Sequence, residues 1–160
     1  MGFYTWAHIY TNSFYGSNQC TQEFIQNVNA ALKQHNGMFV EDFEVKFGFH
    51  SELVIHLDNL VRFVTASQTK NLAFDLVPAT FSGLYDRYLF PFELLDYGST
   101  LRLQRIQLGL VHIKLPSQFS GLPNLRKLDL HLVHATTKDL NVLLSCSSLE
   151  WLSMVWCHLI

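Results

Sequence analysis

Apolar residues recur at fixed positions in three segments of the C-terminal third of the chain. Residues 103–108 (LQRIQL), 125–130 (LRKLDL) and 149–154 (LEWLSM) are each apolar at their first, fourth and sixth positions. The segments begin 22 and 24 residues apart. Apolar side chains at alternate positions are typical of a β-strand with one buried face. The sequence therefore predicts three copies of one structural unit.

Two earlier segments, 40–45 (VEDFEV) and 69–74 (TKNLAF), fit the same template more loosely. Between the copies, residues 21–35, 52–66 and 137–145 place apolar side chains at helical spacing. Ser51 and either Thr136 or Thr137 are candidate N-caps for the last two of these helices. Strands that alternate with helical crossovers predict a parallel sheet.

The L-x-x-L-x-L template and its spacing are those of leucine-rich repeats, whose period is about 20–29 residues. We therefore predict an α/β fold, a ribonuclease-inhibitor-like solenoid of parallel strands with helical or irregular crossovers. It would hold about five repeats over residues 21–160, with an aromatic insert at about 78–100 that is punctuated by Pro78 and Pro91. Residues 1–20 match no repeat and are expected to be irregular or disordered.

The last residues, 156–160 (WCHLI), are mostly apolar and have no polar capping repeat after them. The ends of a repeat array need a polar outer face for solubility. We therefore expect an array that is truncated at its C-terminus, or one whose end is covered by another molecule.

Strand residues that flank the inward apolar pair must point to the concave face of the solenoid. In the best-matched repeats these outward residues predict a partner-binding surface, which consists of Arg105, Gln107, Lys127, Asp129, His131 and Trp151. Arg105 and Lys127 would be neighbours, which favours a partner acid between them. Trp151 has two interpretations: an exposed anchor for a partner, since Trp is common in interface hot spots, or a side chain that packs on a following repeat.

Charge adds little to this picture. Charged residues make up 15% of the chain and the formal net charge is −2, so we expect neither a nucleic acid nor a membrane as partner. Residues 1–100 hold five basic and ten acidic side chains, against six and three in residues 101–160. This asymmetry is either chance or a bipolar surface that steers a partner. Cysteine is scarce and no signal peptide is evident, so we expect a cytoplasmic or nuclear protein.

Candidate chemistry is sparse. Asp129, His131, His134 and Asp139 lie close in sequence, but we interpret them as surface and loop residues of a repeat. Cys146, Cys157 and His158 lack the paired spacing of a zinc site, and we interpret the two cysteines as buried structural residues. No motif of a hydrolase, nucleotide-binding loop or zinc enzyme occurs. We therefore predict no enzyme activity, no cofactor and no metal.

Residues 35–48 (HNGMFVEDFEVKFG), 61–76, 88–96 (YLFPFELLD) and 113–157 together resemble the repeat region of plant F-box/leucine-rich-repeat proteins, especially those of grasses. In that family an N-terminal F-box docks on the Skp adaptor of a cullin-type ubiquitin ligase, and the repeats capture the substrate. Residues 1–34 contain no F-box, so the resemblance implies a Skp adaptor as partner only if an F-box lies upstream.

The resemblance implies a protein-interaction module for an unknown protein substrate, similar to the substrate-recognition repeats of a ligase subunit. The alternative is a truncated structural or regulatory fragment that has no link to a ligase.

Overall fold

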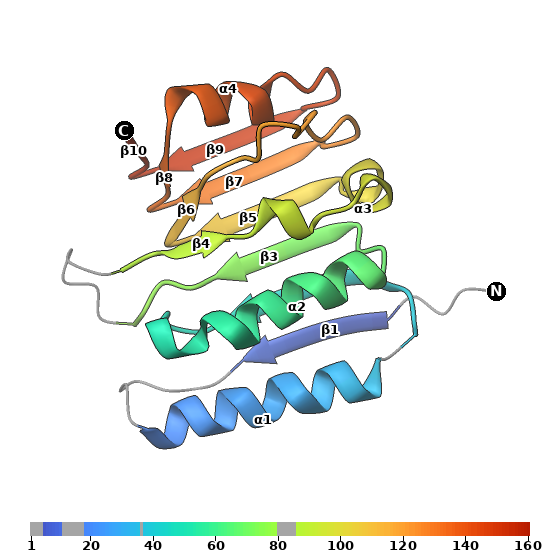
Figure 1. Cartoon of the computed structure of the whole chain (residues 1–160), viewed down its shortest axis with the longest axis vertical. Helices are drawn as coiled ribbons and strands as arrows, with labels where there is room; N and C mark the ends of the chain where they lie inside the picture. The colour runs from blue at the N-terminus through green and yellow to red at the C-terminus, as the bar shows by residue number, and fades with distance from the viewer. Residues whose placement is uncertain (1–4, 11–17, 36, 80–85) are drawn as a thin grey trace.

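The computed structural model describes residues 5–10, 18–35, 37–79 and 86–160, which form a stack of repeats with two parallel sheets (Figure 1). The larger sheet has six strands in chain order: β1 (Thr5–Tyr10), β2 (Val40–Lys46), β3 (Asn71–Asp75), β5 (Arg105–Gly109), β7 (Lys127–His131) and β9 (Trp151–Val155). The smaller sheet has four: β4 (Tyr88–Phe90), β6 (Val111–Ile113), β8 (His134–Ala135) and β10 (His158–Leu159). The predicted leucine-rich-repeat architecture is confirmed.

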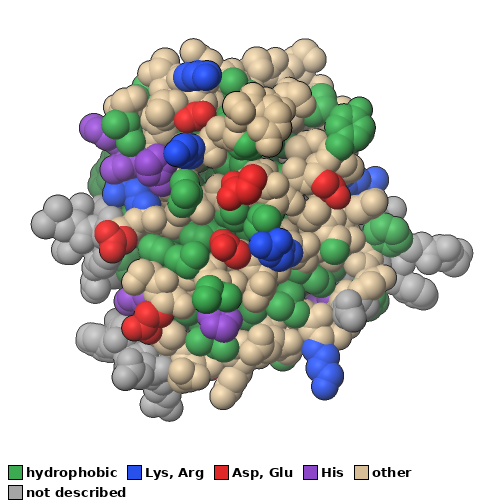
Figure 2. All heavy atoms as spheres, viewed as in Figure 1, with side chains coloured by type: hydrophobic (Ala, Val, Ile, Leu, Met, Phe, Trp, Pro, Cys, Tyr) green, Lys and Arg blue, Asp and Glu red, His purple; other side chains and the backbone are tan. Residues whose placement is uncertain are grey.

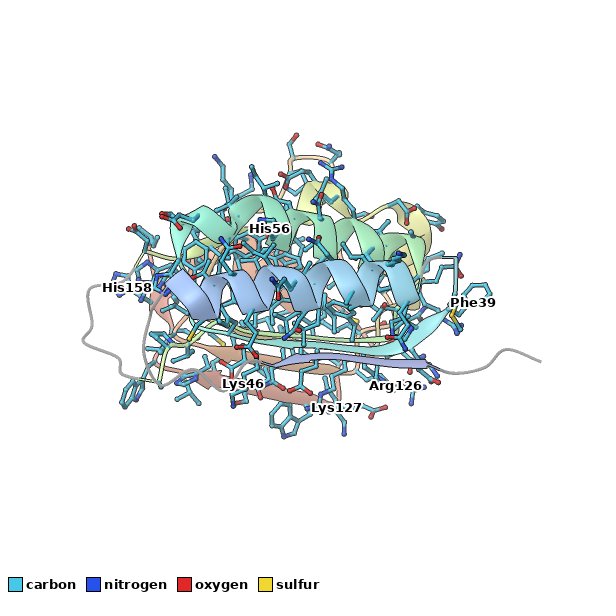
Figure 3. The ribbon with its side chains drawn as sticks, turned by 90° about the horizontal axis from the view of Figure 1, so that it is seen from below. Phe39, Lys46, His56, Arg126, Lys127 and His158 are labelled. Atoms are coloured by element: carbon cyan, nitrogen blue, oxygen red, sulfur yellow. The ribbon has the colours of Figure 1, made fainter. Side chains whose placement is uncertain are left out.

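Helical segments connect the strands and lie on one side of the six-stranded sheet (Figures 1 and 3). They are α1 (Asn18–Gln34), η1 (Ser51–Leu53), α2 (Val54–Ala66), η2 (Phe92–Leu94), α3 (Tyr97–Arg102) and α4 (Thr137–Leu144). The three predicted helices are present within a few residues of their expected bounds. Thr136 is the N-cap of α4, whereas Ser51 begins a 3₁₀ turn and caps nothing.

Inward strand residues form continuous rows in the core. Phe43, Leu72, Ile106 and Leu128 lie side by side in register, and all are at most 2% exposed. Burial of each such side chain stabilises the fold by about 1.5–3 kcal/mol. In β9 the same row continues at Leu152, which is 43% exposed because β9 is the last strand of the sheet.

The N-terminal segment differs from the expectation for residues 1–20. Residues 5–10 form β1, which pairs in parallel with β2, and α1 begins at Asn18. The six-stranded sheet therefore has one strand more than the five repeats predicted. Ala7 and Ile9 stand opposite the inward residues Phe43 and Val45, and Ile9 is only 2% exposed. This strand contains no leucine, so the leucine template does not detect it.

The described part of the aromatic segment at 78–100 is not an insert but the outer side of a repeat. Its described part contains β4, which pairs with β6 in the four-stranded sheet, followed by η2 and most of α3; residues 80–85 lie outside the described part. Tyr88, Phe90 and Phe92 are 1% exposed and fill the core. Phe90 meets Phe74 of the six-stranded sheet edge-on, with ring centroids 5.6 Å apart.

A left-handed residue joins the two sheets in three successive repeats. Leu110, Leu132 and Trp156 follow β5, β7 and β9 and have φ of 58°, 54° and 53°. The backbone N–H groups of Leu110 and Leu132 donate to His131 and Val155, the last residues of the next strands. Each left-handed non-glycine residue costs roughly 1–2 kcal/mol, which the strand pairing on both sides offsets.

The concave face as a candidate binding surface

The predicted ladder of outward side chains is present, strand by strand. We call the face of the six-stranded sheet opposite the helices the concave face (Figure 3). Its first row is Asp42, Asn71, Arg105, Lys127 and Trp151, its second is Glu44, Ala73, Gln107, Asp129 and Ser153, and its third is Lys46, Asp75, Gly109, His131 and Val155. All six predicted site residues therefore share one face, and three of them belong to the first row.

Polar groups near the N-terminal end of this face are largely satisfied by one another. Asn71 donates from Nδ2 to Asp42 Oδ1 at 2.8 Å. Lys46 Nζ and Asp75 Oδ2 form an ion pair at 3.5 Å. At the margin, Lys70 Nζ lies 2.8 Å from Glu41 Oε1. These acids already have partners, so they offer little to an incoming cation.

The centre of the first row is different, because two cations stand together. Arg105 and Lys127 are directly opposite each other in β5 and β7, and both are exposed. Arg105 makes a long hydrogen bond of 3.5 Å to Gln107 Oε1. Within the described residues neither Arg105 nor Lys127 forms an ion pair, whereas the neighbouring Arg126 pairs with Glu150 at 3.7 Å.

Trp151 extends this row beyond the two cations. It is opposite Lys127 in register and 47% exposed. A large aromatic ring that is half exposed beside cations presents apolar area and a π face to a partner. The position of Trp151 on the concave face is as predicted.

Two hollows lie where the rows contain small side chains. The first, of about 150 Å³, lies over Ala73 between Glu44 and Arg105. The second, of about 270 Å³, lies over Gly109 between Asp75 and His131. A Cβ at Gly109 would lie 3.1 Å from Asp75 Oδ1 and 3.3 Å from Val77 Cγ2, so glycine keeps this hollow open. Gln107 lines both hollows, which makes it the centre of the face.

The Asp and His residues that are close in sequence are dispersed by the fold. Asp129 and His131 face the concave side, whereas His134 lies in the four-stranded sheet. Asp139 accepts hydrogen bonds from Thr136 Oγ1 at 2.7 Å and from the Leu115 N–H at 3.3 Å. Among the described residues no group of three or more His, Cys, Asp or Glu side chains could hold a metal ion.

The cysteine thiols are engaged in local structure. Cys146 Sγ is 3.3 Å from the carbonyl oxygens of Pro123 and Leu125, and Cys157 Sγ is 3.4 Å from that of Leu130. Both cysteines are half-buried rather than fully buried, and both pack against the core. Each thiol therefore contacts the backbone of the preceding repeat.

A second ladder, which sequence reasoning missed, lies on the four-stranded sheet. His112, His134 and His158 are in register in β6, β8 and β10. Their ring centroids are 6.5 and 5.2 Å apart. Histidine side chains gather over this part of the surface in Figure 2. Each histidine lies four positions after the last inward residue of the preceding strand of the six-stranded sheet, so the repeat spacing alone could have revealed the ladder.

Burial lowers the pKa of His134, and the charges of Arg87, His158 and His112 lower that pKa further. Arg87 precedes β4 and donates from Nε to the Leu132 carbonyl at 3.1 Å. Burial also lowers the pKa of Arg87 itself. The neutral imidazole of His134 is therefore favoured in the folded chain.

The repeat stack and its ordered outward rows define a leucine-rich-repeat domain. The family model described as the At1g61320/AtMIF1 leucine-rich-repeat domain matches residues 31–160, and the chain belongs to this family. Comparison with curated proteins gave no significant match, and neither did comparison with solved structures. Leucine-rich-repeat domains are protein-interaction modules and are typically not enzymes. None of the described helices has the length and apolarity needed to cross a bilayer.

Proposed function

We propose that the concave face binds a segment of another protein, in the manner of the substrate-recognition repeats of an F-box subunit in a cullin-type ubiquitin ligase. One observation carries the choice of this face. The concave face combines two cations that have no ion pair within the described residues with a half-exposed tryptophan and two open hollows. Arg and Trp are the residue types that dominate binding energy at interfaces.

A steric block of the first hollow tests the binding face. Ala73→Trp would fill the hollow with a side chain that β-strands accept well. Ala30→Trp is the matched control, because Ala30 is exposed on α1, on the other side of the sheet. Partners captured on the immobilised chain should be lost with Ala73→Trp and retained with Ala30→Trp. Equal capture by both variants would exclude the concave face.

The link to a ubiquitin ligase rests on the resemblance to plant F-box/leucine-rich-repeat proteins. Its test is co-purification from plant cells of the gene product that carries these repeats. Recovery of the Skp adaptor and cullin would support the ligase role. Recovery of the repeat partner without Skp or cullin would favour the alternative, a regulatory protein outside any ligase. A cytoplasmic or nuclear location, where such ligases act, belongs to the same proposal.

A further inference from the structure

The charges of the concave face are arranged unevenly along the first row, and this arrangement restricts the partner. At one end Asp42 is held by Asn71 at 2.8 Å. In the middle, Arg105 and Lys127 lie side by side in register on adjacent strands, and neither forms an ion pair within the described residues. At the other end stands Trp151. The row therefore runs from a satisfied acid through two open cations to an apolar ring.

Two neighbouring cations repel each other, so the free face stores a small unfavourable energy that an anion relieves. Neighbouring strands lie about 4.8 Å apart, which lets a single carboxylate reach side chains of both β5 and β7. Arg105 presents a planar fork that matches a carboxylate, and Lys127 adds a flexible point charge. A carboxylate at this point would receive charge-assisted hydrogen bonds from both.

The second row limits where that carboxylate can lie. Asp129 is two residues beyond Lys127 in β7, on the same face, and it is half-buried beside Gln107. Its charge would repel an acid placed over the second row. The favourable position for an anion is therefore over the first row, with a neutral or basic group of the partner over Asp129.

We propose that the partner segment crosses the first row with an Asp or Glu side chain over Arg105 and Lys127 and an apolar side chain beside Trp151. This inference rests on the proposed function, because it assigns the chemistry of the partner at the same face. It commits to a carboxylate of a protein segment, in which an acidic residue is followed or preceded by a large apolar one.

A displayed library of random peptides, sorted on the purified chain, tests the proposal without knowledge of the natural partner. The wild-type chain should enrich peptides that combine Asp or Glu with a neighbouring large apolar residue. The double variant Arg105→Glu with Lys127→Glu should lose these peptides and enrich basic ones instead. The control Arg62→Glu with Lys138→Glu, which changes two exposed cations on α2 and α4, should enrich the same peptides as wild type.

Affinity of a selected acidic peptide gives the second readout. The double variant should bind it about tenfold or more weakly, which corresponds to about 1.4 kcal/mol or more. Wild-type affinity should also fall as salt rises, since exposed charges are screened. Thermal melts of both double variants confirm that each is folded, and Arg105→Gln with Lys127→Gln provides a milder version of the same test.

The possible outcomes separate this proposal from the function on which it rests. If Ala73→Trp abolishes enrichment but charge reversal changes nothing, the concave face binds protein and the acidic partner is wrong. Enrichment of peptides without acids overturns the acidic partner in the same way. If neither Ala73→Trp nor charge reversal affects enrichment of the selected peptides, the concave face is not the binding site. Enrichment that reverses its charge with the double variant supports both.

Discussion

The hydroxyl of Tyr88 in β4 donates a 2.6 Å hydrogen bond to Asp58 Oδ1 in α2, and this bond links the four-stranded sheet to a helix of the neighbouring repeat. The ring of Tyr88 is 1% exposed and stacks against Phe74 with centroids 6.5 Å apart. Burial raises the pKa of Tyr88, and the bond to Asp58 and the charges of Asp58 and Glu93 raise it further. The phenol is therefore held in its neutral, donating form.

Tyr88→Phe should lower the free energy of unfolding by about 1.5–3 kcal/mol, because it removes a hydrogen bond to a charged group and keeps the ring. Tyr88→Ala should cost about 3–5 kcal/mol, since it also leaves a cavity. Urea unfolding measures both. Tyr97→Phe is the control, since Tyr97 is 75% exposed and its hydroxyl should contribute almost nothing. Equal effects at the two tyrosines would refute the structural role of the bond.

The inward row should become less sensitive to truncation toward the C-terminal end. Leu128→Ala should cost about 2–5 kcal/mol, as is usual for a fully buried leucine; Leu128 is 1% exposed. Leu152→Ala, at the next position of the row and 43% exposed, should cost less than half as much. Urea unfolding of the two variants provides the comparison. A larger cost at Leu152 would mean that another molecule, such as a second copy, covers β9 in solution.

Thr136 should contribute more to stability than its neighbour Thr137. Thr136 Oγ1 accepts the Asp139 N–H at 3.0 Å, and its hydroxyl donates to the Asp139 carboxylate at 2.7 Å. Thr136→Ala should therefore cost about 0.5–2 kcal/mol, the usual effect of a lost N-cap. Thr137→Ala, at the exposed first helical position, should be close to neutral. Thermal or urea unfolding that ranks the two variants the other way would contradict this assignment of the cap.

The histidine ladder should make stability depend on pH. The folded-state pKa of His134 is lowered below its unfolded value by burial and by the charges of Arg87, His158 and His112. The unfolded chain therefore binds more protons than the folded chain at low pH. The contribution of His134 to stability is fully present above the unfolded pKa of about 6.5. It falls as pH drops from about 6.5 through the folded pKa.

Urea midpoints at pH 7.5 and 5.5 measure this loss. His134→Gln should lose less stability between the two pH values than the wild-type chain does, because the imidazole whose pKa is lowered in the folded chain is absent. His56→Gln on α2, which leaves the ladder intact, should behave like the wild type. A His134→Gln variant with an unchanged pH dependence would show that the ladder does not contribute.

Leucine spacing predicted much of this fold and failed where other residues fill the leucine positions. Repeats at 103–108, 125–130 and 149–154 were readable because leucine, isoleucine and methionine mark their inward faces, and the register of the outward rows follows from strand geometry alone. The leucine template does not detect β1, because the strand contains no leucine and its buried residue is Ile9, which is 2% exposed. The leucine template does not detect β4 either, because Tyr88 and Phe90 fill the core in place of aliphatic residues.

The candidate site, too, could be predicted only in part from the sequence. Positions of Arg105, Lys127 and Trp151 in one row could be deduced from the repeat, since each stands one residue before an inward apolar position. The ion pairs that leave only some charges available could not, because they depend on side-chain conformations. The hollows over Ala73 and Gly109 could not be predicted from the sequence either, because their shape depends on how the side chains of neighbouring strands lie in three dimensions.

Site-specific photo-crosslinking from the centre of the concave face tests the central claim most directly. A benzophenone amino acid in place of Gln107 lies between the two hollows, and the same amino acid in place of Ile55, which is 71% exposed on α2, samples the helical side. We expect a covalent adduct with the partner protein from position 107 and none from position 55. Adducts only from position 55, or equal adducts from both positions, would contradict it.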